Sequence, residues 1–198
     1  SVTGEPGLGK SRLFYEFKRL AHGCVLLESS AVSYGSSSPY LPVIELLKSY
    51  FQIQSHDDDR TRYERVLGKV LALDRGLEET LPYLCAVLGI EEHASSVEQL
   101  DPQMNRQRIC DAVTRLLLRE SRNQCLVLIV EDLQWVDRGT QAVLDTLSDK
   151  LSAANVLLLV NYRPEYHHEW EQKTDYTRVQ LAPLGTADTE ELLTGLLG

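Results

Sequence analysis

The sequence predicts an α/β fold in which a mostly parallel sheet is sandwiched between helices. Residues 125–130 and 156–160 are uninterrupted apolar runs, and such runs are typical of strands that are buried on both faces of a parallel sheet. Segments with apolar residues at helical spacing surround them. Strands that alternate with helices favour a parallel sheet over an antiparallel one.

The first elements of the chain are a helix and a short strand. Residues 11–21 carry an apolar stripe, and Gly23 follows them as a residue that commonly ends helices. Residues 24–27 are apolar and indicate a short buried strand. Residues 34–40 are rich in serine and glycine, which is typical of a loop.

A helical segment is predicted over residues 42–100 as an insertion within the domain. Proline is favoured in the first turn of a helix, so Pro42 marks the beginning of the first helix. After this segment, Asp101 and Pro102 combine a capping side chain with a first-turn proline. They predict a further helix that ends near Arg122.

The remaining segments complete the alternation of helices and strands. We expect a helix over 140–151, a weaker strand over 177–181 and a last helix over 186–197. Together the elements predict one domain over residues 1–198. We expect this domain to be truncated at both ends, with its N-terminal strand largely missing, because a glycine-rich loop that normally follows a strand comes almost at once.

That glycine-rich loop carries the clearest chemistry in the chain. It matches the pattern G-x-x-x-x-G-K-[ST] of the phosphate-binding P-loop. The matching residues are Gly4, Glu5, Pro6, Gly7, Leu8, Gly9, Lys10 and Ser11. Glycines let the backbone approach phosphate oxygens, and successive N–H groups with the next helix N-terminus form a positive concavity. We expect Lys10 to contact the β- and γ-phosphates of ATP, and the Ser11 hydroxyl to bind Mg²⁺.

Two acidic residues follow the first apolar run. Glu131 and Asp132 come directly after residues 125–130. In P-loop enzymes an acidic residue at this point holds Mg²⁺, and a neighbouring polar group orients the attacking water. We therefore assign Glu131 to the metal and Asp132 to the water, and leave open an exchange of the two roles.

Polar residues also follow the second apolar run. Ligands of open α/β sheets bind beyond the carboxyl ends of the strands, where Asn161 and Arg163 lie. Arg163 is the first candidate for a contact that reports the γ-phosphate. Asn161 is the rival candidate for the same role.

With these motifs assigned, the chain resembles the STAND-type signalling ATPases among the AAA-related P-loop proteins. The resemblance is closest to modules of large bacterial regulators, which accompany class III adenylate or guanylate cyclases, or LuxR-type helix-turn-helix domains with tetratricopeptide repeats. It implies that Arg12, directly after the P-loop, also binds the nucleotide. The matching stretches are Gly4–Arg12, Val130–Asp137, Val160–Glu165 and Leu181–Leu184.

The resemblance implies ATP rather than GTP, and a switch between ADP-bound closed and ATP-bound open or assembled forms. It gives catalytic roles to Lys10, Asp132 and Arg163, and metal-binding roles to Ser11 and Glu131. The partners it implies are ATP and ADP, self-association, and other domains of the same polypeptide, namely a cyclase or helix-turn-helix output and a repeat sensor. Trp135 and Asp137 match the motif without an assigned role.

Four functions compete for the P-loop. A GTPase needs the base-reading pattern N-K-x-D, which the sequence lacks. A small-molecule kinase would need an acceptor lid with a cluster of arginines for a phosphorylated acceptor, which we do not expect of the helices of residues 42–90. The leading hypothesis is a Mg²⁺-dependent ATPase with slow hydrolysis that acts as a regulatory switch. A module that binds ATP or ADP without turnover is the alternative, because the same residues fit it.

Composition narrows the partners further. The net charge of −9 argues against direct binding of nucleic acid or of anionic membranes. The sequence contains no signal peptide and no apolar run of transmembrane length. None of the four cysteines has C-x-x-C spacing, and Cys24 and Cys125, within apolar runs, are expected to be buried, reduced thiols of a cytoplasmic protein.

Three further features are interpreted as structural. The acidic run of residues 57–59 is expected to be solvated before a helix, where the helix dipole favours negative charge. His167 and His168 are expected on a surface loop. Trp170 is expected to anchor the packing of that loop.

Overall fold

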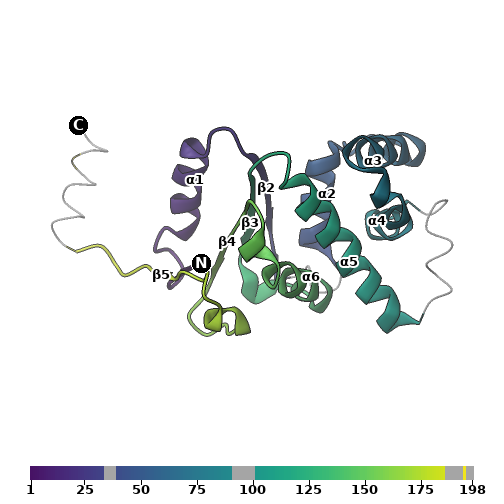
Figure 1. Cartoon of the computed structure of the whole chain (residues 1–198). Helices are drawn as coiled ribbons and strands as arrows, with labels where there is room; N and C mark the ends of the chain where they lie inside the picture. The colour runs from purple at the N-terminus through teal and green to yellow at the C-terminus, as the bar shows by residue number, and fades with distance from the viewer. Residues whose placement is uncertain (34–38, 91–100, 186–193, 195–198) are drawn as a thin grey trace.

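The computed structural model describes residues 1–33, 39–90, 101–185 and 194. Apart from residue 194, the helix expected over 186–197 lies outside the described residues. The described chain forms a sheet with helices on both sides (Figure 1).

The sheet has five strands in the order β2-β3-β4-β1-β5. All pairings between neighbours are parallel, which confirms the predicted α/β fold with a parallel sheet. Strand β4 lies between β1, which leads into the P-loop, and β3, which leads into the acidic pair. The strands are β1 (Val2–Thr3), β2 (Val25–Ser30), β3 (Leu126–Glu131), β4 (Val156–Tyr162) and β5 (Val179–Gln180).

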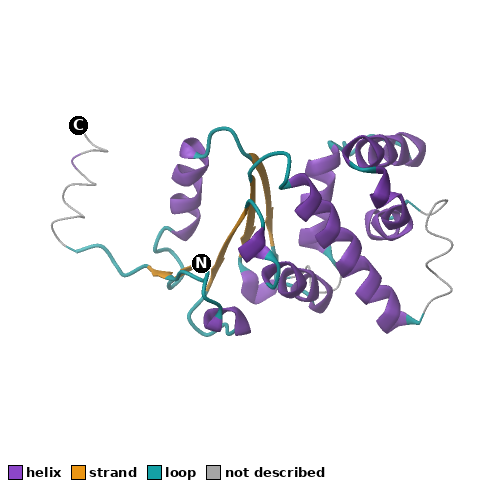
Figure 2. Cartoon of the chain, viewed as in Figure 1, coloured by secondary structure: helices purple, strands orange, loops and turns teal. Residues whose placement is uncertain are grey.

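The helices form unequal layers on the two faces of the sheet. Helix α1 covers one face, whereas α2, α5 and α6 cover the other, with α3 and α4 beyond them (Figures 1 and 2). The α-helices are α1 (Lys10–Leu20), α2 (Leu41–Phe51), α3 (Asp59–Leu73), α4 (Leu81–Leu88), α5 (Pro102–Glu120) and α6 (Arg138–Ser148). Shorter 3₁₀ turns are η2 (Arg75–Thr80), η4 (Leu133–Trp135), η5 (Leu151–Ala153) and η6 (Glu169–Gln172).

Strand β3 shows why the apolar runs lack polar interruptions. Leu126, Leu128 and Val130 belong to the large core on the side of α2, α5 and α6. Val127 and Ile129 belong to a smaller core on the side of α1, together with Phe14. Because successive side chains of a strand point to opposite faces, a strand between two helical layers needs an apolar residue at every position.

Aspartate side chains fix the beginnings of three helices. Asp101 accepts a hydrogen bond from the backbone N–H of Gln103 at 2.9 Å, so the predicted cap of α5 is confirmed. Asp58 accepts from Thr61 N–H at 2.8 Å at the start of α3. Asp137 plays the same part for α6. These caps satisfy N–H groups that have no partner within the helix.

The helices of the predicted insertion share the core of the sheet. Val43 and Leu47 of α2, Val66 of α3 and Leu84 of α4 lie in the same buried cluster as Leu128 of β3. Helix α4 packs on α5, which in turn packs on α6. None of the described helices combines the length and the apolar character of a membrane span.

The structure corrects the burial expected for two cysteines. Cys125 is exposed and Cys24 is only partly buried, whereas Cys85 and Cys110 are buried. The reason is that β2 begins at Val25 and β3 at Leu126, so each of the two misjudged cysteines lies just outside the strand.

Two further expectations on polar residues need revision. The carboxylate of Asp57 is not solvated: its side chain is 5% exposed and pairs with Arg65 at 3.1 Å. His168 is partly buried among aromatic rings, with its ring centre 5.0 Å from that of Tyr162 and 4.6 Å from that of Trp170. Trp170 itself is 4% exposed, so its expected packing role is confirmed.

Candidate functional site

The loop between β1 and α1 has the backbone that its glycines allow. Gly7 and Gly9 have φ angles of 85° and 89°, in the left-handed region that residues with a Cβ rarely adopt. Gly9 immediately precedes α1, and no side chain of the described residues caps this helix. The first-turn N–H groups of α1 therefore remain available to an anion.

Lys10 points back into this loop. Its Nζ donates hydrogen bonds to the backbone oxygens of Gly4 at 2.7 Å and Glu5 at 2.9 Å. The side chain is buried, with 9% of the residue exposed. The loop thus holds an ammonium group at its centre, next to the N-terminus of α1.

The acidic end of β3 meets the P-loop directly. Ser11 Oγ donates a hydrogen bond to Glu131 Oε2 at 2.5 Å. Odd-numbered positions of β3, such as Val127 and Ile129, face α1. Glu131 continues this alternation, so the strand itself directs its carboxylate toward the serine at the start of α1.

Asn161 lies on β4, between β3 and β1. Together with Ser11 and Glu131 it forms a hydrogen-bonded junction. Its Nδ2 donates to Glu131 Oε2 at 2.8 Å, and its Oδ1 accepts from the backbone N–H of Asp132 at 2.7 Å. The carboxylate only accepts and the N–H only donates, so both bonds fix the orientation of the amide. The residue is 1% exposed. A single buried side chain therefore positions both acidic residues.

Asp132 has an unusual backbone conformation and a fixed carboxylate. Its φ of 60° and ψ of 48° are left-handed, a conformation that is uncommon for residues other than glycine, is more frequent for aspartate than for most, and recurs at active sites. Gln134 Nε2 donates to Asp132 Oδ1 at 2.9 Å, and Gln134 Oε1 accepts from the backbone N–H of Arg163 at 3.2 Å. Sequence reasoning missed Gln134, for which a polar residue beside Leu133 and Trp135 was the only signal.

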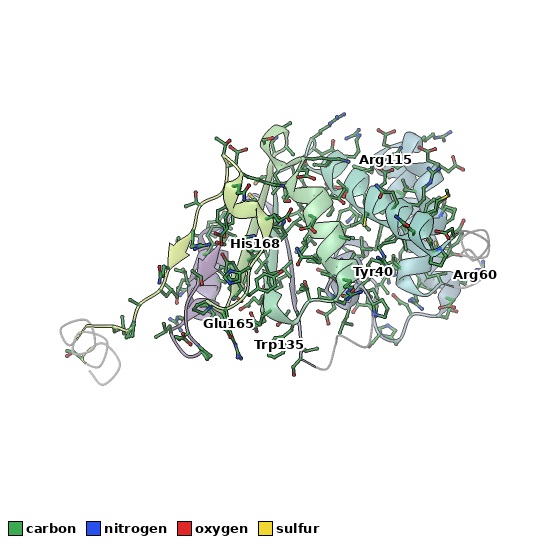
Figure 3. The ribbon with its side chains drawn as sticks, turned by 90° about the horizontal axis from the view of Figure 1, so that it is seen from below. Tyr40, Arg60, Arg115, Trp135, Glu165 and His168 are labelled. Carbon is green, nitrogen blue, oxygen red and sulfur yellow. The ribbon has the colours of Figure 1, made fainter. Side chains whose placement is uncertain are left out.

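The side chain of Arg163 lies over the Trp135 ring. Its guanidinium carbon is 5.6 Å from the centre of the Trp135 ring, and Trp135 and Glu165 lie at the same edge of the domain (Figure 3). Of the two candidates at the end of β4, the structure brings Asn161 to Glu131 and Ser11, and places Arg163 against Trp135.

A comparison with known families decides what kind of site this is. The family described as "AAA ATPase domain" matches residues 1–160, which include the P-loop, the acidic pair and most of β4. The chain belongs to this family. The AAA ATPase domain is a nucleotide-binding module of the P-loop class, so the phosphate-binding chemistry expected of the loop is that of its family.

One curated relative extends over nearly all of the AAA ATPase domain. It is an uncharacterized protein of Rhizobium meliloti (strain 1021), 26% identical over 197 residues, or 95% of this chain. The chain spans only 18% of the length of that protein. No solved structure gives a significant match.

Two other residues of the matched motifs, Arg12 and Asp137, make their contacts outside the junction of Ser11, Glu131 and Asn161. Arg12 lies along α1, with a side chain that is 71% exposed and pairs with Glu16 at 2.5 Å. Asp137 accepts from the N–H groups of Gly139 at 2.8 Å and Thr140 at 3.1 Å. It thereby fixes the start of α6 and the end of the loop that carries Asp132.

The donor set at the junction suits a magnesium ion. Mg²⁺ is usually held by one or two carboxylates or hydroxyls together with substrate phosphates and water. The two oxygen atoms that would face the ion, Ser11 Oγ and Glu131 Oε2, lie 2.5 Å apart. The described residues contain no cluster of three or more histidine, cysteine or acidic side chains that would bind a metal without a substrate.

A cavity elsewhere in the domain is separate from this junction. It measures about 830 Å³ and lies beside β4. Its lining includes residues 156–160, Trp170 and Tyr176, and none of residues 4–12.

Proposed function

We propose that this AAA ATPase domain binds Mg²⁺-ATP where the P-loop, β3 and β4 meet, and hydrolyses its terminal phosphoanhydride bond slowly. In this proposal the domain acts as a nucleotide-driven regulatory switch in a larger bacterial signalling protein. The observation that carries it is the junction of Ser11, Glu131 and Asn161, in which residues from α1, β3 and β4 share one carboxylate oxygen.

The P-loop supplies the phosphate contacts. Lys10 exchanges its hydrogen bonds with the oxygens of Gly4 and Glu5 for bonds to the β- and γ-phosphates, since an ammonium interacts more strongly with an anion than with a neutral carbonyl. The N–H groups of residues 7–11 and the dipole of α1 favour the same negative charge. Arg12 contributes its backbone N–H, and its exposed side chain reaches a bound nucleotide by exchanging its ion pair with Glu16.

The acidic residues divide the remaining work. Ser11 and Glu131 hold Mg²⁺, which neutralises phosphate charge when it is bound. Asp132 orients the attacking water, because Gln134 holds its carboxylate and Asn161 holds its backbone. Asn161 is the residue that links the γ-phosphate site to both acids. Arg163, the first candidate from the sequence, becomes the alternative for that contact.

The regulatory role rests on the length of the relative and on the family resemblance. A match to 18% of the R. meliloti protein supports a domain that works beside others in one polypeptide. We propose cyclase or helix-turn-helix output domains and a repeat sensor as these neighbours, self-association in the ATP-bound form, and a cytoplasmic location. We also propose that residues 42–100 are an insertion within a single domain over residues 1–198.

Calorimetric titration tests the binding half of the proposal. ATP and ADP are titrated into the protein with and without Mg²⁺, and into Lys10→Ala. Lys18→Ala is the matched control, because it removes the same charge from the same helix at an ion pair with Glu28. We expect binding by the wild type and by Lys18→Ala, and a loss of at least about 10-fold in Lys10→Ala, as for a charge-assisted contact of about 1.5–3 kcal/mol. Equal affinities of both variants would remove the P-loop from the proposal.

Turnover measurements separate the acids and test for hydrolysis. Glu131→Gln should abolish the gain in ATP affinity that Mg²⁺ provides, whereas Asp132→Asn should retain it and lose phosphate release. The reverse pattern would exchange the two roles. A wild-type rate no higher than that of Asp132→Asn, with binding that depends on Lys10, would favour the module that holds nucleotide without turnover.

A further inference from the structure

Two cysteines lie side by side at the end of the sheet opposite the nucleotide site. Cys24 immediately precedes β2 and Cys125 immediately precedes β3. These strands are parallel neighbours in which Val25 is paired with Leu126. The backbone N–H of Val25 donates to the oxygen of Cys125 at 2.9 Å, so the pairing continues to the cysteines themselves.

The strand geometry suits a covalent bond between them. Neighbouring strands lie about 4.7–4.9 Å apart, within the range of about 4.4–6.8 Å between Cα atoms of disulfide-bonded cysteines. Cys24 packs against the small core that contains Val127 and Ile129. Cys125 has the same parity along β3 as these two residues, so the alternation of the strand directs both thiols to the same face.

The thiols already interact. The pKa of Cys125 is raised, first by a hydrogen bond with the Cys24 thiol and then by burial and by the charge of the Cys24 thiolate. Cys125 is exposed and Cys24 is partly exposed, whereas Cys85 and Cys110 are buried in the large core. An oxidant in solution can therefore reach this pair before either of the other cysteines.

We propose that Cys24 and Cys125 are a reversible oxidation site, which closes to an intramolecular disulfide in the presence of a small disulfide such as oxidised glutathione. The bond would join β2 to β3 at their amino ends. Ser11, Glu131 and Asn161 lie at the other end of the sheet, so the site is separate from the phosphate and metal contacts.

The chemistry balances as two thiol–disulfide exchanges. The thiolate of the more exposed Cys125 attacks one sulfur of oxidised glutathione, which releases one glutathione thiolate and leaves a mixed disulfide. The thiolate of Cys24 then attacks the Cys125 sulfur and releases the second glutathione. The protein loses two electrons and two protons, and oxidised glutathione gains them to become two molecules of reduced glutathione.

The bond should raise the stability of the folded domain. It closes a loop from residue 24 to residue 125, which includes α2 to α5. A covalent link across so long a loop strongly restricts the unfolded chain, provided that the native geometry accepts it. We expect a higher melting temperature for the oxidised form and a return to the original value after reduction with dithiothreitol.

Mass spectrometry provides the direct test, because trypsin separates all four cysteines. The native protein is treated with oxidised glutathione, then denatured so that N-ethylmaleimide can block every remaining free thiol, and digested without reduction. Cleavage after lysine and arginine places Cys24, Cys125, Cys85 and Cys110 in peptides 20–48, 123–138, 76–106 and 109–115. The expected product joins 20–48 to 123–138 and weighs two hydrogen atoms less than their sum, while the other two peptides carry N-ethylmaleimide.

Variants and electrophoresis complete the test. Cys24→Ser should leave a mixed disulfide with glutathione on Cys125 and no rise in melting temperature, whereas the matched control Cys110→Ser should still form the bond. Non-reducing electrophoresis should show the oxidised chain as a monomer. The proposal is overturned by wild-type protein in which Cys125 retains glutathione, by dimers linked through Cys125, or by a linked peptide that contains Cys85 or Cys110.

Discussion

The most discriminating prediction concerns Asn161, since it separates two candidates for one role. Asn161→Ala removes a hydrogen bond to the charged Glu131 and another from the Asp132 N–H group. Hydrogen bonds to charged groups contribute about 1.5–3 kcal/mol, and those between neutral groups about 1 kcal/mol. Because Glu131 keeps its bond from Ser11, we expect the free energy of unfolding to fall by about 2–4 kcal/mol.

The rate of ATP hydrolysis by Asn161→Ala should fall by more than its loss of folding stability alone would explain. Without Asn161 the Asp132 backbone loses the bond that fixes its left-handed conformation. A catalytic group that is misplaced by about 1 Å can cost about 100-fold in rate, so we expect a decrease of that order in phosphate release. Asn161→Asp should be at least as damaging at neutral pH, because it sets a second carboxylate beside Glu131 and cannot donate to it.

Arg163→Ala is the matched control, two positions further along the same segment. Its guanidinium lies over the exposed ring of Trp135, a contact that contributes about 0.5–1 kcal/mol at such sites. Urea denaturation followed by circular dichroism gives the stabilities, and a phosphate-release assay gives the rates. The reasoning is refuted if Arg163→Ala lowers stability and turnover more than Asn161→Ala, or if Asn161→Ala unfolds within about 0.5 kcal/mol of the wild type.

Three further predictions follow from other contacts. Tyr50→Phe removes the 2.5 Å hydrogen bond to the buried Glu120 carboxylate, and should lower the free energy of unfolding by about 1–3 kcal/mol in urea titration; an unchanged midpoint would contradict it. Asp137→Ala should cost about 1–2 kcal/mol through loss of the α6 cap, and Asp137→Ser should recover part of it in the same assay. Burial lowers the pKa of His168 to about 4, below the value of about 6.5 expected in the unfolded chain. Only the unfolded state then binds a proton between these values, so stability should fall as the pH decreases from about 6.5 to about 4. His168→Asn keeps an acceptor for the backbone N–H of Trp170 and should reduce this loss of stability, measured as the melting temperature at each pH. An identical pH dependence of the melting temperature in both proteins would exclude His168 as its source.

The sequence by itself determined the features that depend on neighbours along the chain. The apolar run of β3 predicted a parallel strand buried on both faces, and that of β4 predicted a further parallel strand. In β4 the apolar run is less covered than in β3, since Leu157 is 43% exposed. The helix start at Asp101 followed from its side chain and the adjacent proline. The acidic pair was expected at a strand end near the phosphate loop, because parallel strands bring their carboxyl ends to one edge.

Only the tertiary structure decided which polar side chains meet at that edge. Strand β4 extends to Tyr162, two residues beyond its apolar run, because β1 pairs with Asn161 and Tyr162. Asn161 is therefore held within the sheet, beside Glu131, while Arg163 is the first residue to leave it. In the same way, the strand starts left Cys24 and Cys125 uncovered at the opposite edge. Such choices depend on pairing between segments far apart in the sequence, which a local pattern does not encode.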